Sequence, residues 1–173
     1  MFAYSGIAHA GYMLIAIIAL KQEASGVLLL YSISYTIATI TAFAVLILVR
    51  EETGTFSIKA FDGLSKHNPT EAFAMTIAML SLAGIPPLVG FAAKCNLFVS
   101  AIEQGNLPLV IVAIIGSMIS VYYYIRPVIA MYANEPSGTS AIDSSSNYKK
   151  QIILAAFLMI VLGLIPGVIV NLI

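Results

Sequence analysis

The chain has 173 residues, of which 60% are hydrophobic and only 9% are charged. A soluble domain carries roughly 25% charged residues, so this chain has too few charges to cover a water-soluble globule and is not expected to be a soluble enzyme. Its eight basic and eight acidic side chains cancel, which argues against a nucleic-acid partner because such proteins have a basic excess. The single cysteine, Cys95, excludes an internal disulfide and a cysteine metal cluster. We therefore expect an integral membrane protein surrounded by lipid.

Five long apolar runs predict an all-α, polytopic membrane protein with about five transmembrane helices, in a single membrane domain that covers residues 1–173. About 20 helical residues cross the roughly 30 Å hydrocarbon layer of a bilayer. Four of the runs fit that length when tilt is allowed. The expected helices cover residues 2–20, 26–49, 70–102, 107–132 and 151–172.

The run 70–102 is too long for one simple span, and Gly84-Ile85-Pro86-Pro87 interrupts its middle. Each proline removes a backbone donor and clashes with the preceding turn. Inside a membrane, the carbonyls that this frees are tolerated only where protein or water satisfies them. We therefore expect one discontinuous helix, broken at 84–87 by Gly84, Pro86 and Pro87.

Lys94 lies seven residues after Pro87, about two helical turns beyond the expected break. Ionisable residues within a span are costly and indicate function by default. Because burial disfavours the ammonium, such a lysine can exchange protons near neutral pH, and we favour a proton-carrying role. The alternative is a static lysine that caps the carbonyls freed by the break.

His9 and Arg126 are the other two ionisable residues that we place inside the spans. His9 follows Ser5 and precedes Tyr12 at helical spacing, so the three share one face. An imidazole can pass a proton at physiological pH, but it can also simply bond a neighbouring helix. Arg126 lies late in its span, where it can reach the membrane interface, and we interpret it as structural.

Hydroxyl groups form two further stripes, which either bond helices together in lipid or line a hydrated path. The second span carries Ser32, Tyr35 or Thr36, and Thr39, and the fourth carries Ser117, Ser120 and Tyr124. The fifth run has no polar side chain from Ile152 to Val170, which predicts a lipid-facing structural helix. The candidate hydroxyls of a hydrated path are Ser5, Tyr12, Thr39, Ser120 and Tyr124.

Loop charge predicts the orientation of the helices. Loops 50–69 and 133–150 fall on one side, whereas the opposite side has only Lys21. By the positive-inside rule those two loops face the cytoplasm or matrix, and the C-terminus faces the intermembrane or periplasmic side. The basic residues of the two loops are Arg50, Lys59, Lys66, Lys149 and Lys150.

The chain lacks the usual cofactor motifs. It contains no GxGxxG, phosphate-binding loop, CxxC or histidine pair at ligand spacing. We therefore expect no cofactor site, no metal site and no catalytic residue in this chain, and we expect its work to be transport.

Three stretches resemble the antiporter-like subunits of respiratory complex I. Residues 4–12, YSGIAHAGY, are similar to the YSSIAHAGY-like stretch of that family, and their AHAGY form is typical of its subunit N branch (subunit 2 in mitochondria). Residues 80–87, LSLAGIPP, with the following GFAAK of residues 90–94, resemble the LSLAGIPP…GF…K signature. Residues 121–126, VYYYIR, resemble the YYYLR of subunit N. The motifs occur in the family's order along the whole chain.

The resemblance implies the fold and the residues that carry protons. The family has fourteen helices with two inverted five-helix repeats, each containing a discontinuous helix. This chain then corresponds to the last five helices, with the family lysine of helix twelve at Lys94 and the histidine of helix ten at His9. The first-repeat glutamate and lysines have no positions here, and the chain begins Met1-Phe2-Ala3 where the family has a basic pair. We therefore expect either a split subunit, in which a separate chain supplies the upstream helices, or a fragment of a longer chain.

The function that the resemblance implies is proton translocation in the membrane arm of NADH:quinone oxidoreductase, coupled to quinone reduction elsewhere. The chain is then part of an enzyme, the proton-translocating NADH:ubiquinone reductase, while flavin, iron–sulfur clusters and quinone belong to partner subunits. Expected partners are the other membrane-arm subunits and lipid, in the mitochondrial inner membrane or the bacterial cytoplasmic membrane. Two alternatives remain: a subunit of a related multisubunit cation/proton antiporter or membrane-bound hydrogenase, and a purely structural bundle.

Overall fold

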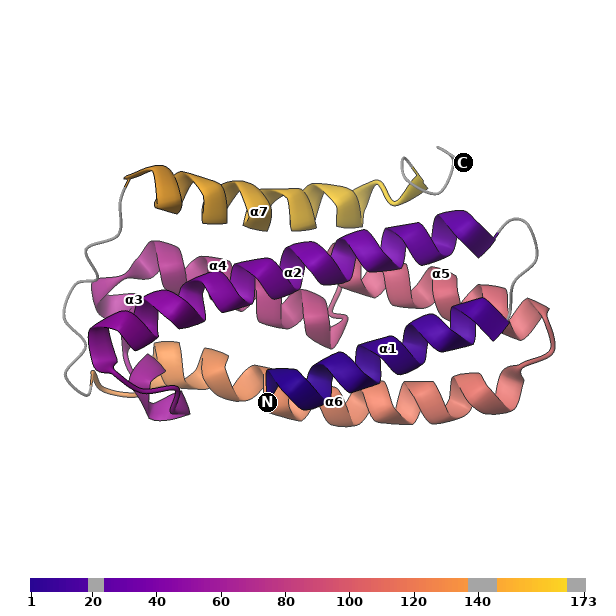
Figure 1. Cartoon of the computed structure of the whole chain (residues 1–173), viewed down its shortest axis with the longest axis horizontal. Coiled ribbons are helices and arrows are strands. Elements are labelled where there is room, and N and C mark those ends of the chain that lie inside the picture. Colours follow the sequence, from indigo (N-terminus) through magenta and orange to yellow (C-terminus); the bar gives the residue numbers. More distant parts are fainter. Residues whose placement is uncertain (19–23, 137–145, 168–173) are drawn as a thin grey trace.

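The computed structural model describes residues 1–18, 24–136 and 146–167, and it is helical throughout (Figure 1). The ends of the expected runs 2–20 and 151–172, part of loop 133–150 and Lys21 lie partly or wholly outside the described residues. The described elements are α1 (Phe2–Ile18), α2 (Ala24–Thr53), the 3-10 helix η1 (Ile58–Phe61), α3 (Leu64–His67), α4 (Pro69–Ala83), α5 (Val89–Glu103), α6 (Leu107–Ala133) and α7 (Ser146–Leu164).

The all-α membrane class is confirmed, as is the discontinuous helix. Within the described residues, α2, α6 and α7 are long and apolar enough to cross a membrane, while α1 and α4 are shorter apolar helices. The expected third helix is two helices, α4 and α5, which follow each other in one direction and are separated by residues 84–88 (Figure 1).

Local sequence signals explain where these helices begin and end. Pro69 starts α4, where its missing N–H is not needed. Gly84 ends the same helix in the left-handed conformation that glycine adopts without strain. Helix α2 continues to Thr53, four residues beyond the expected end at 49, because the polar residues that follow Val49 lie on its exposed end.

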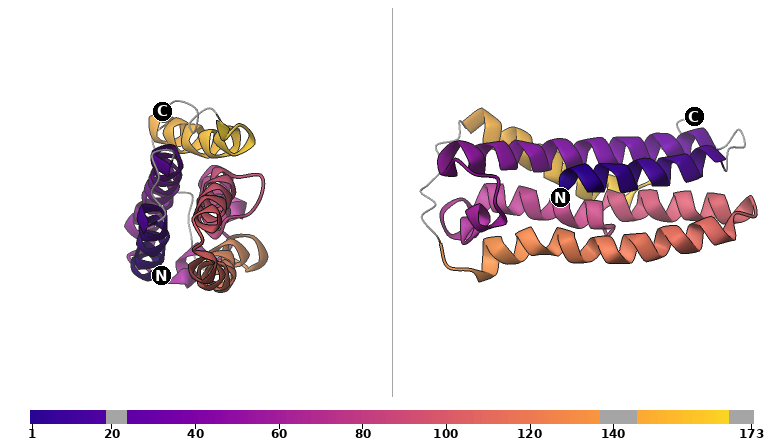
Figure 2. Two further views of the ribbon diagram at one scale, coloured as in Figure 1. Left: turned by 90° about the vertical axis from the view of Figure 1, so that its right-hand side faces the viewer. Right: turned by 60° about the horizontal axis from the view of Figure 1, so that its bottom comes forward.

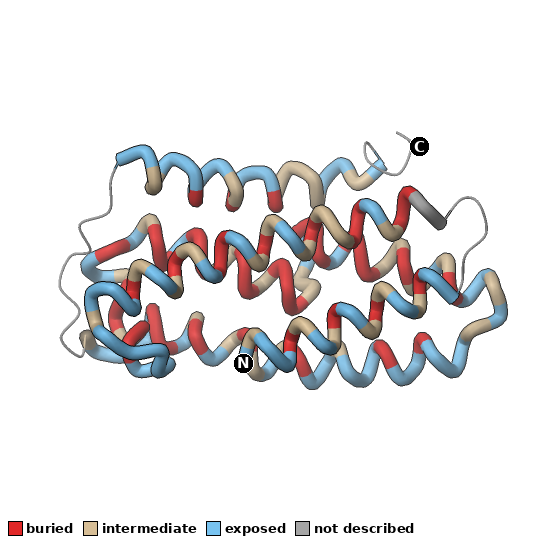
Figure 3. Tube along the Cα trace, viewed as in Figure 1, coloured by how far each residue is buried: buried red, intermediate tan, exposed pale blue. Residues whose placement is uncertain are grey.

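The helices pack around α2 and α4, which lie side by side at the centre of the bundle. Figure 2 shows α2 and α1 on one side, α4, α5 and α6 on the other, and α7 across one edge. Buried positions recur along α2, α4 and α5 (Figure 3). Small residues let membrane helices approach closely, and the fully buried ones include Ala38, Ala42, Ala72, Ala74 and Ala78.

The connection between α2 and α4 folds onto the end of α6. The backbone N–H of Gly63 donates to the carbonyl of Ala130 at 3.0 Å, and the hydroxyl of Ser65 donates to the carbonyl of Met131 at 2.8 Å. Lys66 forms an exposed ion pair with Glu135, with 2.8 Å between Nζ and Oε2. The two polar loops, before α4 and after α6, therefore lie at the same end of the bundle (Figure 1).

Candidate functional site

The break between α4 and α5 creates unpaired backbone acceptors at the centre of the bundle. Gly84 has φ +82°, and its N–H donates to the carbonyls of Leu80 and Ser81 at 3.1 and 3.0 Å. Ile85 N–H also donates to Leu80, at 3.0 Å. This is the pattern of a Schellman cap. It leaves the last two carbonyls of α4 without a partner from their own helix.

Lys94 of α5 supplies that partner. Its side chain folds back along the break, and its Nζ donates hydrogen bonds to the carbonyl oxygens of Leu82 at 3.0 Å and Ala83 at 3.1 Å. A third bond goes to the hydroxyl of Ser117 on α6, at 3.0 Å. Nζ also lies 5.4 Å from the ring centroid of Tyr12, a cation–π distance. Lys94 is only 5% exposed.

Oxygen dipoles rather than a carboxylate balance the charge of Lys94. In the parts of the chain that the structure describes, no acidic side chain forms an ion pair with it. A buried ammonium without an ionic partner is costly. The arrangement therefore supports both interpretations of the sequence, a lysine that caps broken-helix carbonyls and a lysine that can give up its proton.

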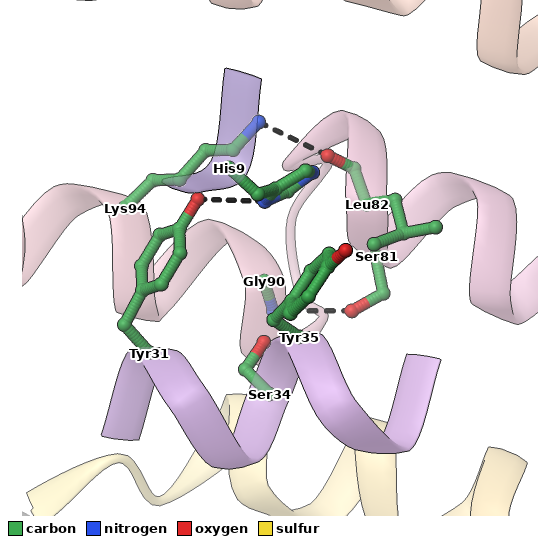
Figure 4. Close-up of a pocket in the computed structure, with 8 residues that line it drawn as sticks. All are labelled: His9, Tyr31, Ser34, Tyr35, Ser81, Leu82, Gly90 and Lys94. Atoms are coloured by element: carbon green, nitrogen blue, oxygen red, sulfur yellow. Dashed lines mark hydrogen bonds between the residues drawn. The ribbon is translucent and has the colours of Figure 1, made fainter. Parts of the chain in front are cut away.

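His9 of α1 lies beside Lys94, and both line one small cavity (Figure 4). The cavity measures about 10 Å³, close to the smallest space that holds one buried water. Six of its eight lining residues carry a polar side-chain group, and such partners are the second condition for a water. The residues around it are His9, Tyr31, Ser34, Tyr35, Ser81, Leu82, Gly90 and Lys94.

Both ring nitrogens of His9 are hydrogen-bonded to tyrosine hydroxyls. Nδ1 lies 2.7 Å from the hydroxyl of Tyr31 on α2, and Nε2 lies 3.1 Å from that of Tyr124 on α6. The Tyr124 hydroxyl also bonds the hydroxyl of Ser5, and the His9 ring stacks on Tyr35 with centroids 4.7 Å apart. Three helices thus hold one imidazole, which is 4% exposed.

Four of the five hydroxyl candidates lie in or next to this cluster. Ser5 and Tyr124 extend from His9, and Tyr12 lies against Lys94. Ser120 donates to the carbonyl of Ser117 at 2.6 Å, so it supports the residue that contacts Lys94.

Thr39 is the candidate that the structure does not bring to the site. Its hydroxyl is buried without a hydrogen-bond partner, and it lines a separate hollow between α2 and α7. The face of α2 that meets the site starts one position earlier than the stripe inferred from the sequence, at Tyr31, and continues through Ser34 and Tyr35. Arg126 is exposed, with its guanidinium 6.0 Å from the ring centroid of Tyr122.

Tyr31 is the contact that sequence reasoning missed, whereas Ser117 belonged to the expected hydroxyl stripe of the fourth span without being singled out as a site residue. Each donates or accepts a bond to one of the two ionisable residues, Tyr31 to His9 and Ser117 to Lys94. A helical pattern that runs through Tyr31, Ser34 and Ala38 was the available signal, because these positions recur every three to four residues. Among the described residues, no group of three or more His, Cys, Asp or Glu side chains could hold a metal ion.

A lysine held against the free carbonyls of a broken membrane helix, next to a buried histidine, defines a class of protein. Discontinuous helices with such groups at membrane depth are the ion and proton sites of transport proteins. The fold and the site therefore have the features that are typical of ion- and proton-transporting membrane proteins.

Comparison with known proteins agrees with this class. The profile of the family described as "NADH:quinone oxidoreductase/Mrp antiporter, TM" matches residues 1–120. The chain is 37% identical over 171 residues to NADH-quinone oxidoreductase subunit N of Cytophaga hutchinsonii, and 41% identical over 172 residues to that of Flavobacterium johnsoniae. Both alignments cover 99% of this chain and 37% of the relative. The chain thus spans little more than a third of the length of these relatives.

Solved structures of related membrane complexes also match this chain over nearly its whole length. A chain of respiratory complex I from Thermus thermophilus, with bound aureothin, matches with a TM-score of 0.82 and 34% identity, over 98% of this chain and 38% of that chain. A chain of the Mrp complex from Dietzia sp. matches with a TM-score of 0.85 over 98% of this chain and 40% of that chain; at 18% identity this likeness shows the fold alone. The chain belongs to the NADH:quinone oxidoreductase/Mrp antiporter transmembrane family.

Proposed function

We propose that this chain is a proton-translocating part of the membrane arm of NADH:quinone oxidoreductase and corresponds to the last five helices of subunit N. The similarity to subunit N of several bacteria supports this assignment. As part of that enzyme, the chain contributes to coupling between quinone reduction elsewhere and proton pumping. Flavin, iron–sulfur clusters and quinone belong to its partner subunits.

Lys94 is the proton-carrying group in this proposal, and the observation that carries it is the hydrogen bonding of its ammonium. The three oxygens around Nζ stabilise the charged form. Burial at 5% exposure opposes that charge. The two effects have opposite signs, so a modest change in the local field during a redox cycle is enough to load or unload the proton.

His9 is the proposed partner of Lys94 in proton transfer. The two residues line the same cavity, which has the size of one water and offers that water the polar groups of their side chains (Figure 4). On its other side, His9 continues through Tyr124 to Ser5. This row of hydroxyls gives the proton a path away from the helix break, with Tyr12, Ser117 and Ser120 supporting Lys94.

The proposed setting is a bacterial cytoplasmic or mitochondrial inner membrane, with the C-terminus on the periplasmic or intermembrane side. The alternative function is that of a subunit of a multisubunit cation/proton antiporter or membrane-bound hydrogenase, since the family description includes the Mrp antiporters. Purification of the native assembly separates the two, because only the oxidoreductase co-purifies with flavin and iron–sulfur proteins that oxidise NADH.

The test of the proposal is substitution of Lys94 in the assembled complex. We expect Lys94→Ala to lower proton translocation at least tenfold and to slow the coupled NADH oxidation, because the proton carrier is lost while helix contacts remain. Lys94→Arg is also expected to impair pumping, because a guanidinium keeps its proton. The measurement is proton uptake per NADH oxidised in membrane vesicles.

A lysine that only caps the broken helix gives a different result. In that case Lys94→Arg, which can still donate to the carbonyls of Leu82 and Ala83, pumps normally, and Lys94→Ala fails to assemble. The amount of assembled complex, measured by native gel, is the control for both variants. Unchanged proton stoichiometry in both assembled variants contradicts the proposal.

A further inference from the structure

Helix α7 lies along the broken helix and contacts both of its halves, α4 and α5 (Figure 1). Its outward side is exposed, as expected for a lipid-facing helix, and carries Ile153, Leu154, Phe157 and Leu158. Its inward side is a regular stripe in which the buried residues are Ile152, Ala156 and Met159. One turn before this stripe lies Lys149, and one turn after it lies Gly163. The buried stripe therefore lies between two contacts of α7, one made by Lys149 and the other by Gly163.

The first contact ties α7 to the beginning of α4. Glu71, in the first turn of α4, is a carboxylate with only 1% of its surface exposed. Lys149 Nζ approaches its Oε1 to 3.9 Å. A buried acid is stabilised by an opposite charge and by the helix N-terminus that carries it. The pair therefore fixes where α7 starts relative to α4.

The second contact ties α7 to the beginning of α5, beyond the break. A Cβ placed on Gly163 would overlap the backbone of Pro87, Leu88 and Val89, at separations that real Cβ atoms do not show. These backbone atoms cannot move aside as a flexible side chain does. Gly163 is therefore the point at which α7 touches the peptide chain of the break itself.

We infer that α7 is a brace that fixes the spacing of α4 and α5, and that Gly163 and Lys149 are positioning residues for Lys94. Lys94 belongs to α5, whereas its acceptors Leu82 and Ala83 are the last residues of α4. A change in the spacing of the two helices therefore changes the length of those two hydrogen bonds. The role assigned to Lys94 rests on the proposed function; the brace itself rests on the contacts of α7.

The test is Gly163→Ala in the assembled complex, with Gly11→Ala as its matched control. Both glycines are helical, but a Cβ on Gly11 meets nothing within 4 Å. We expect Gly163→Ala to lower proton translocation at least fivefold and to move the alkaline limb of its pH profile down by about one pH unit, because an ammonium with fewer acceptors loses its proton more readily. Gly11→Ala is expected to leave both unchanged.

The pH profile distinguishes positioning from general destabilisation, which lowers the amount of complex equally at every pH. The titratable groups that face Lys94 are His9 and Tyr12 of α1 and Tyr31 and Tyr35 of α2. None of these groups belongs to α7. An unshifted profile in an assembled Gly163→Ala complex overturns the brace, whereas normal pumping in Lys94→Ala overturns the proposed function instead.

A second pair of variants decides the matter if Gly163→Ala does not assemble. Lys149→Gln weakens the pair with Glu71, whereas Lys150→Gln removes the same charge from the adjacent residue, which forms no ion pair among the described residues. We expect the pH profile to shift in the same direction with Lys149→Gln and to stay in place with Lys150→Gln. Equal profiles in these two variants contradict the inference.

Discussion

At the scale of single residues, the proposed proton path depends on the tyrosines around His9. A neutral imidazole carries its proton on one nitrogen and accepts at the other. A tyrosine hydroxyl both donates and accepts, so the contacts from Tyr31 to Nδ1 and from Tyr124 to Nε2 suit either arrangement. When the hydroxyl on the unprotonated nitrogen donates its proton to the ring, the opposite nitrogen releases its own proton to the other hydroxyl. One proton thus crosses the ring without ring rotation, and the first hydroxyl takes a replacement proton from its own side. His9 is thus held in place and still has two usable states.

Removal of one hydroxyl tests this relay. We expect Tyr31→Phe to reduce proton translocation about three- to tenfold, because Nδ1 of His9 is left buried without a partner and the two states are no longer equivalent. Tyr124→Phe is expected to act similarly and also to leave Ser5 without its contact. Proton uptake per NADH in vesicles measures both effects.

Tyr122→Phe is the control for these variants, because it removes the same hydroxyl from an exposed ring of the same helix as Tyr124. It is expected to pump normally. Full pumping by Tyr31→Phe and Tyr124→Phe contradicts the relay and leaves His9 as a residue that joins helices.

Helical spacing predicts part of this cluster and misses the rest for a physical reason. Ser5, His9 and Tyr12 share a face of α1 at i, i+4 and i+7, and all three are buried as that spacing predicts. On α2, polar residues occur on several faces, so polarity alone does not show which face points inward. The face that carries Tyr31 points inward because small residues on the same face, such as Ala38 and Ala42, let α4 approach closely.

The burial of Glu71 is a second feature that the local sequence pattern does not predict. Its place in the first turn of α4 matches a helix-start signal, which explains the residue without burial. The position of α7, far along the chain, brings Lys149 to the carboxylate. No local pattern contains that information.

At the scale of the elements, the two prolines predict a break but not its geometry. The sequence does not predict which carbonyl accepts a hydrogen bond from Lys94, because every carbonyl near the break is a candidate. The structure assigns Leu82 and Ala83 because Gly84 turns the chain by a left-handed cap and directs these two carbonyls toward α5. A Cβ on Gly84 would lie 3.0 Å from Cδ of Lys94. Glycine is thus required both for the turn and for the approach of the lysine.

Substitution of Gly84 separates these two requirements. Gly84→Ala costs about 1–2 kcal/mol for the left-handed backbone, and it also displaces the Lys94 side chain. Gly105→Ala has nearly the same φ, +79°, but a Cβ there meets nothing within 4 Å. We expect both variants to lower the thermal stability of the complex similarly, while only Gly84→Ala lowers proton translocation severalfold. Thermal unfolding and vesicle pumping, measured on the same preparations, check this. Equal pumping by the two variants means that the backbone conformation alone matters.

At the scale of the whole molecule, most of the basic residues gather at one end of the bundle. Hydrogen bonds join the loop before α4 to the end of α6, as between Asn134 and Asp62 at 2.7 Å. The end that contains these loops carries Arg50, Lys59, Lys66, Lys149 and Lys150. The surface between the two ends is covered with large apolar side chains, notably along α6 and α7, which suits lipid or apolar neighbouring helices.

This uneven distribution of basic residues predicts which end faces the cytoplasm or matrix. Basic residues in short loops stay on the inner side of the membrane, so the end that contains η1 and α3 is expected to face inward and the turn between α5 and α6 outward. Because Cys95 is the only cysteine in the chain, a Cys95→Ser background allows single cysteines at Ser57, which is exposed, and at Gln104, which is partly exposed. We expect Ser57→Cys to react with a membrane-impermeant maleimide only in inside-out vesicles, and Gln104→Cys to react only in right-side-out vesicles. Both residues lie in connections between helices, so neither substitution disturbs the core, and full reaction after detergent is added shows that each cysteine is available. The opposite pattern contradicts the orientation.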